Sequence, residues 1–227
     1  MNLLLAAALL MQDKTAEETF KSLQESIRVA KTVQVTYRVV IQGSDQGKAM
    51  AEFTGDMLLK DGNKVYLSAY MDPAGTLVVV CDGSSVVRMR YPSLTQPVKV
   101  KAPEDLRDQA SQTVPLRSAP FKYPMDPVWR LFEPGIQEAV PLKFLPTEFE
   151  WGVEEANAKT LTYTDKGVDY SLKNKLWLEP KSSRLLKQVE TFSLTTGFSG
   201  TRTTTYSKFI LNADIPDEKF KLPEEKK

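Results

Sequence analysis

Residues able to carry chemistry are scarce in this sequence. His is absent, and Cys81 is the only cysteine among 227 residues. These counts exclude an intrachain disulfide, His-dependent catalytic triads and most zinc, haem and iron–sulfur sites. Cys81 ends the apolar run 77–81, where burial raises the pKa of a thiol and makes it unreactive. The pattern therefore favours a buried strand thiol over a reactive one.

The remaining candidate for chemistry is a group of four glutamates, Glu148, Glu150, Glu154 and Glu155. They could form a paired-carboxylate site of the glycosidase kind. Phe149 alternates with the first two, however, which is typical of the solvent side of a strand and favours that interpretation. The sequence also lacks a glycine-rich phosphate loop and a nucleophile elbow. We expect no enzyme, no catalytic residue, no cofactor and no metal.

Charge excludes another class of protein. Lys and Arg number 30 and Asp and Glu number 29, so the formal net charge is +1. A nucleic-acid-binding domain usually carries a strong basic excess. Hydrophobic residues make up 41% of the chain, as in ordinary globular proteins. We therefore expect a globular binding or structural protein that does not bind nucleic acid.

The elements begin with one amphipathic helix. Thr15 and Glu18 have the spacing of a capping box, and apolar residues follow at intervals of three and four up to Ala30. The spacing predicts a helix over 16–31 that packs against a sheet. From Val33 the apolar period changes to two, which predicts a strand. Asp61-Gly62 and Asp82-Gly83 then predict two hairpins with type I′ turns in an antiparallel meander. Further strands are predicted at 147–153, 159–164, 170–178, 185–194 and 201–211.

Residues 92–147 differ from the strand regions on either side. Nine of the 14 prolines lie between Pro97 and Pro146, and proline is excluded from central strands. We expect loops and short helices here, one at 104–112 and one that begins with Asp126 as N-cap and Pro127 at its first position. The second helix has an apolar face formed by Val128, Leu131 and Phe132, with Trp129 beside it. We interpret this insert as a lid.

The N-terminus carries the apolar run 3–11, nine residues long. A membrane-spanning helix needs about 20 such residues, so the run has the length of a signal-peptide core instead. We predict a short signal peptide at 1–12 and a single domain at 13–227. A buried N-terminal helix or a start codon assigned too late are the alternatives. Cys81 is too far away to be a lipidation site, so we expect no stable membrane anchor.

Several short motifs resemble one known family. The last third contains "L-x-L-x-P" at 176–180, Val189-Glu190 in the next strand, and "N-x-x-I-x-x-x-x-F" from Asn212 to Phe220. Asp82-Gly83 followed by Tyr91-Pro92 adds a hairpin motif. These motifs, in the order helix, meander, helical insert and meander, resemble the LolA-like periplasmic lipoprotein carrier superfamily, including its uncharacterised predicted periplasmic members.

The resemblance implies a mostly β member of the α+β class: a strongly curved antiparallel sheet, or half-barrel, with an N-terminal helix and a helical lid. It also implies an apolar concave face that takes up acyl chains in the periplasm. One position departs from the family. The carrier has Arg-Pro after the lysine of its second strand, whereas Lys60 is followed here by Asp61-Gly62. Lipoprotein hand-over by this chain is therefore left open.

The first functional hypothesis is a monomeric periplasmic carrier or binder of a lipid or acylated lipoprotein, without covalent chemistry. Its candidate ligand-binding residues are the lid residues Val128, Trp129, Leu131 and Phe132 together with Phe53, Leu58, Val65, Leu67, Val79, Met89, Trp151 and Trp177. The alternative is an interaction or sensor module on the same fold that binds an envelope protein. A lipid hydrolase is a third hypothesis, with almost no residue support.

Overall fold

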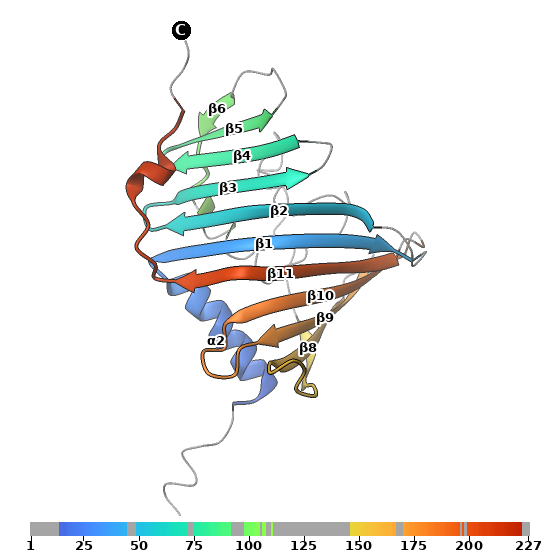
Figure 1. Cartoon of the computed structure of the whole chain (residues 1–227). Helices are drawn as coiled ribbons and strands as arrows, with labels where there is room; N and C mark the ends of the chain where they lie inside the picture. The colour runs from blue at the N-terminus through green and yellow to red at the C-terminus, as the bar shows by residue number, and fades with distance from the viewer. Residues whose placement is uncertain are drawn as a thin grey trace, which may run out of the picture.

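The structure, a computed structural model, describes residues 14–44, 49–71, 75–91, 98–104, 106–107, 110, 146–166, 170–195, 197 and 199–223. Within these residues one antiparallel sheet of 11 strands carries helix α2 (Ala16–Val29) on one face (Figure 1). A 3₁₀ helix, η3 (Asp217–Phe220), lies near the C-terminus. The strands are β1 (Thr32–Gly43), β2 (Ala49–Lys60), β3 (Lys64–Met71), β4 (Gly75–Asp82), β5 (Ser85–Tyr91), β6 (Val98–Lys101), β7 (Thr147–Trp151), β8 (Lys159–Lys166), β9 (Tyr170–Leu178), β10 (Leu185–Leu194) and β11 (Ser199–Leu211).

Helix α2 begins where the capping box predicts. The Thr15 hydroxyl accepts a hydrogen bond from the Glu18 backbone N–H, and the Glu18 carboxylate accepts one from the Thr15 N–H. These bonds satisfy two backbone donors that the first helical turn otherwise leaves unpaired. The apolar stripe Phe20, Leu23 and Ile27 is buried. The predicted helix, and its packing against a sheet, are confirmed.

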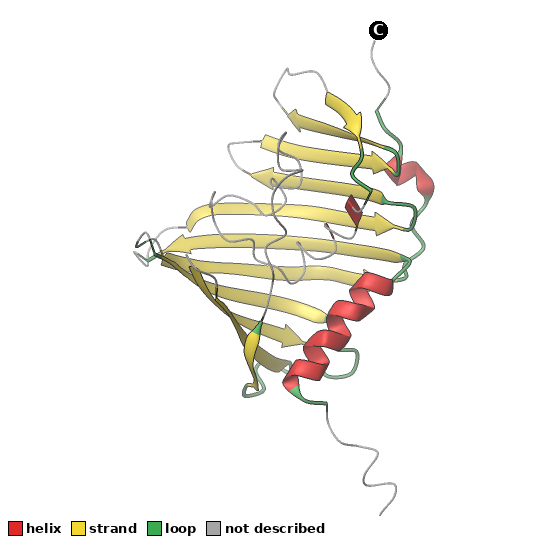
Figure 2. Cartoon of the chain, turned by 180° about the vertical axis from the view of Figure 1, so that it is seen from behind, coloured by secondary structure: helices red, strands yellow, loops and turns green. Residues whose placement is uncertain are grey.

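The first and last strands meet in the middle of the sheet. The strand order is β6-β5-β4-β3-β2-β1-β11-β10-β9-β8-β7, with β1 paired to both β2 and β11. Two meanders, β1–β6 and β7–β11, therefore join along this central pair. Among the described strands β6 and β7 form the two edges and do not pair with each other, so the sheet is open. Figure 2 shows the strands of the second meander curving round towards α2.

The sheet has one large core on its inner face, the face that α2 covers in part. This core contains the buried residues of α2 and the inward residues of the strands, from Val33 on β1 to Phe209 on β11. A smaller cluster lies on the outer face, where Ile215 and Phe220 of the C-terminal segment pack on Leu58. Asp217 of η3 pairs with Lys60 at 2.8 Å and with Lys64 at 3.0 Å, which fastens this segment to the sheet.

The predicted fold class is confirmed: the chain is mostly β, with an open, curved antiparallel sheet and an N-terminal helix. Some local predictions were wrong. The type I′ turn is not formed at Asp61-Gly62 or at Asp82-Gly83, because neither aspartate has the positive φ that such a turn needs. Residues 98–101 form strand β6 inside the stretch assigned to loops and helices, because this edge strand lies between Pro97 and Pro103 and contains no proline itself. The β2–β3 turn has three residues rather than two, with Gly62 and Asn63 both at positive φ and Asp61 ahead of them. Residues 106, 107 and 110 are helical as predicted, and the second insert helix lies outside the described residues.

Candidate functional site

The inner face of the first meander is apolar across β1 to β4. Val35, Met57, Leu67 and Val79 lie opposite one another in adjacent strands and form a row across β1 to β4. All four side chains are at most 1% exposed. We call this set the apolar row. Because side chains alternate along a strand, it continues on both sides into further apolar positions such as Val65 and Phe53.

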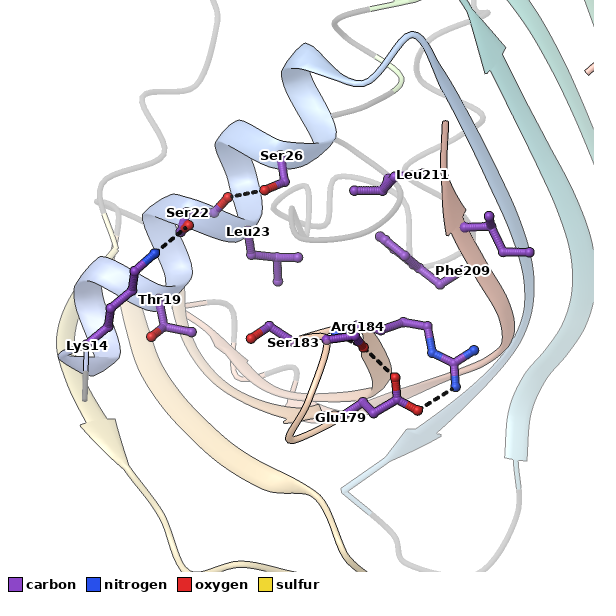
Figure 3. A pocket seen from close by; sticks show the side chains of 12 residues that line it. Lys14, Thr19, Ser22, Leu23, Ser26, Glu179, Ser183, Arg184, Phe209 and Leu211 are labelled. Carbon is purple, nitrogen blue, oxygen red and sulfur yellow. Dashed lines mark hydrogen bonds and ion pairs between the residues drawn. The ribbon is translucent and has the colours of Figure 1, made fainter. Parts of the chain in front are cut away.

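A groove opens between α2 and the sheet, at the end where β11 finishes (Figure 3). Its volume is about 620 Å³, within the range of about 300–1,000 Å³ that ligand pockets usually have. Leu23 of α2 and Phe209 and Leu211 of β11 give the groove an apolar floor. Its other lining residues are Lys14, Thr19, Ser22, Ser26, Glu179, Ser182, Ser183, Arg184 and Ile210.

The rim of the groove is polar and held by local hydrogen bonds. On the helix side, Lys14 donates to the Ser22 hydroxyl at 3.1 Å. On the opposite side, the β9–β10 turn carries Glu179, which accepts hydrogen bonds from Ser182 and from the Arg184 guanidinium, the latter at 3.1 Å. These two partners, Ser182 foremost, hold the pKa of Glu179 below its ordinary value. An apolar floor with a polar rim suits a ligand that has an apolar body and a polar end.

The inner face of the second meander is different, because polar side chains cross it. Tyr163, Asn174, Glu190 and Arg202 lie opposite one another on β8, β9, β10 and β11. We call these four residues the polar row. All are buried: Asn174 and Glu190 are 0% exposed and Arg202 is 7% exposed. The row ends against Ile41 on β1, so it adjoins the apolar part of the same face.

Hydrogen bonds tie the polar row to its neighbours. Arg202 Nη2 lies 3.3 Å from Glu190 Oε2, a buried ion pair. Gln188 donates to Asn174 Oδ1 at 2.9 Å and accepts from the Tyr206 hydroxyl at 3.3 Å. Two atoms are left over: in the described part of the chain, Glu190 Oε1 and Asn174 Nδ2 are buried and have no hydrogen-bond partner.

Burial dominates the acid–base properties of this region. It raises the pKa of the Glu190 carboxyl, which the Arg202 charge opposes and the Asp165 charge reinforces. The pKa of the Tyr163 and Tyr206 hydroxyls is raised by the same desolvation. Asp165, itself 2% exposed, accepts a hydrogen bond from the Tyr170 hydroxyl at 3.3 Å. Among the described residues, the carboxyl groups of Glu190 and Asp165 and the guanidinium of Arg202 are thus buried on the inner face of the second meander.

The structure separates the candidate residues that the sequence grouped together. Phe53, Val65, Leu67 and Val79 belong to the inner-face core. Leu58 does not line that face, because it alternates with Met57 and Leu59 and packs under Ile215 and Phe220 outside. Met89 lies opposite Val78 on the outer side of the sheet. The lid residues Val128, Trp129, Leu131 and Phe132 lie outside the described residues.

The two remaining tryptophans are also away from the inner core. Trp177 shares the outer face with Lys175 and lies beneath the ammonium groups of Lys175 and Lys187, 5.0 and 4.7 Å from the ring centroid. Its indole N–H donates to Glu155 at 3.1 Å. Trp151 is 41% exposed, and its indole N–H donates to the Lys14 carbonyl. The alternation of residues along a strand did not by itself predict on which face of the sheet each tryptophan lies.

Sequence reasoning missed the polar row altogether. One signal was present: Asn174 alternates in step with Leu172, Leu176 and Leu178, so a polar residue occupies an otherwise apolar strand face. Glu190 gave no such signal, because both faces of β10 mix apolar and polar residues. The four glutamates lie on or near β7, and Glu148 and Glu155 pair with Lys166 and Lys175. In the part of the chain that the structure describes, no group of three Cys, Asp or Glu side chains is placed to hold a metal ion, and no helix has the length and apolar character of a membrane span.

Proteins similar to this chain are found among solved structures. No protein-family model and no curated protein matches it. Solved structures do match, among them a LolA superfamily protein from Nitrosomonas europaea, with 14% identity, 92% of this chain and 98% of that chain covered, and a TM-score of 0.38. A second is a putative outer membrane lipoprotein-sorting protein domain from Vibrio parahaemolyticus, with 11% identity, 91% of this chain and 97% of that chain covered, and a TM-score of 0.37. A third is LprF from Mycobacterium bovis, with 9% identity, 88% of this chain and 94% of that chain covered, and a TM-score of 0.43. The likeness predicted from the motifs is found again here as a likeness of fold, and at these TM-scores we base no functional conclusion on it.

Proposed function

We propose that this protein binds an apolar chain, such as the acyl chain of a lipid or of an acylated lipoprotein, on the inner face of its sheet. The observation that carries the proposal is the apolar inner face of β1 to β4 in an open sheet, reached at one end by a groove with an apolar floor. Burial of an acyl chain is worth about 0.8 kcal/mol per CH₂ group, so the hydrocarbon itself supplies the affinity. The protein acts as a carrier or binder and performs no covalent step.

The proposed place of action is the bacterial periplasm, which the N-terminal apolar run 3–11 supports. Native mass spectrometry of protein purified from a cell envelope, followed by organic extraction, tests ligand and location together. We expect a co-purifying lipid or acylated peptide. A ligand-free mass, with no uptake of added phosphatidylglycerol, would contradict the proposal and favour the interaction module that binds an envelope protein.

A groove variant tests the route of entry. Ser26 is exposed on α2 and lines the groove, so Ser26→Trp places a large ring at its mouth without changing the core. Lys21→Trp is the matched control, because Lys21 is exposed on the same helix and does not line the groove. Diphenylhexatriene, a neutral probe that fluoresces in apolar surroundings, reports the binding. We expect Ser26→Trp to weaken or slow uptake and Lys21→Trp to leave it unchanged; equal behaviour of the two variants would exclude the groove as the entrance.

A further inference from the structure

The polar row contains two hydrogen-bonding atoms that the protein leaves unused. Glu190 Oε1 and Asn174 Nδ2 belong to side chains that are 0% exposed, and neither has a hydrogen-bond partner within the described residues. A buried polar atom without a partner costs free energy, and native structures contain few of them. Here two occur on directly opposed residues of neighbouring strands. A bound ligand group that forms hydrogen bonds with both atoms would remove this cost.

The two residues that carry these atoms lie directly opposite each other on neighbouring strands. Opposed residues of an antiparallel pair have Cβ atoms about 4.5–5.5 Å apart on the same face of the sheet. Glu190 Oε2 is engaged by Arg202 and Asn174 Oδ1 by Gln188, so the remaining carboxylate oxygen and amide nitrogen are the free ends. One end accepts a hydrogen bond and the other donates one. The matching ligand group must therefore donate and accept at once.

Charge limits further which ligand group can bind here. Glu190 is itself a carboxylate, and its other oxygen pairs with Arg202. A ligand carboxylate has no hydrogen to donate to Glu190 Oε1, and it would bring a second negative charge beside Glu190 in surroundings of low dielectric constant, where like charges repel strongly. An uncharged group meets no such penalty. The polar row also ends against Ile41, which belongs to the apolar core of the inner face, where a hydrocarbon chain can continue.

We propose that Glu190 and Asn174 form a polar subsite that binds an uncharged donor–acceptor group, such as a carboxamide, at the end of an apolar chain. This inference rests on the proposed function and adds the chemical class of the ligand. The alternative role of the row is purely structural, as a buried network that fixes the pairing of β9, β10 and β11. The two roles differ in what they predict for ligands of equal chain length.

A competition series on the wild-type protein tests the subsite. Oleamide, methyl oleate and oleate carry the same hydrocarbon chain, and each is used to displace diphenylhexatriene. We expect oleamide to bind about tenfold more tightly than methyl oleate, the ratio that 1.4 kcal/mol represents, with oleate weakest. Methyl oleate that binds as well as oleamide would overturn the subsite and leave the proposed function standing. Failure of all three to displace the probe would overturn both.

Two variants test whether the polar row is the source of the preference for oleamide over methyl oleate. Glu190→Gln keeps an oxygen for Arg202 and puts an amide N–H donor in place of the unused acceptor, so the oleamide N–H loses its partner. We expect the advantage of oleamide over methyl oleate to fall below about twofold. Thr204→Val is the control, because Thr204 is buried on the inner face of β11 but is not part of the polar row. It should keep the preference. A preference for oleamide that survives in Glu190→Gln overturns the assignment, and the wild-type series decides the matter if that variant does not fold.

Discussion

The apolar row and the polar row are built on the same kind of antiparallel ladder, yet they bury opposite chemistry. In the first meander, four apolar side chains from β1 to β4 form the apolar row. In the second, Tyr163, Asn174, Glu190 and Arg202 cross β8 to β11 at equal depth. Apolar packing tolerates changes that keep volume, whereas a buried ion pair is costly when one partner is lost. The two halves should therefore respond differently to substitution.

The largest effect is expected where a charge is left alone in the polar row. Arg202→Met removes the partner of Glu190, and breaking a buried pair costs about 3–5 kcal/mol of unfolding free energy. Urea unfolding at pH 7 measures the loss. The double variant Glu190→Leu/Arg202→Met should recover most of it, since neither member of the broken pair then leaves a buried charge. A double variant as unstable as the single one would mean that packing, not charge, makes this row sensitive.

Substitutions in the apolar row should lower the free energy of unfolding through the loss of side-chain volume, not through an unpaired charge. Leu67 is 1% exposed in the centre of β3. Leu67→Ala deletes buried methyl groups and leaves a cavity, which costs about 3 kcal/mol. Leu67→Met keeps the volume and should cost less than about 1.5 kcal/mol. The same unfolding measurement compares them; equal losses would show that shape rather than volume governs the first meander.

A smaller effect is expected at the start of α2, which packs against the second meander. Thr15→Ala removes the hydroxyl that caps the helix, at a cost of about 1 kcal/mol. Thr15→Ser keeps the cap and serves as the control. Thermal unfolding followed by circular dichroism measures both variants. If Thr15→Ala and Thr15→Ser melt together, the capping box does not contribute to the stability of the fold.

The smallest effect is a pH dependence confined to the polar row. Burial raises the pKa of Glu190 above its ordinary value, although Arg202 opposes the shift. Between the unfolded and folded pKa values, the folded chain binds more protons than the unfolded chain, so stability falls as pH rises through this window. Lowering the pH from 7 towards 5 should therefore stabilise the wild type relative to Glu190→Gln. Parallel stability curves for the two proteins over this range would contradict the raised pKa.

Much of the fold could be predicted from the sequence because it depends on neighbouring residues. The capping box places the start of α2 at Thr15, and alternation from Val33 onward defines the strands. Gly62 and Gly83, both at positive φ, mark two of the turns between them. β6 was missed because its four residues are too few for a periodic signal and prolines flank it.

The candidate site could be predicted only in its chemistry, not in its position. The sequence by itself determined that this chain forms a β-rich sheet with one amphipathic helix, and that it has few residues able to act in catalysis. Both follow from composition and from the local spacing of apolar residues. Only the tertiary structure decided that β1 meets β11, that Leu58 and Trp177 face outward, and that Glu190 lies opposite both Asn174 and Arg202. The reason is physical: helix starts and turns arise from contacts a few residues apart, whereas the register and facing of paired strands are set by contacts between distant segments.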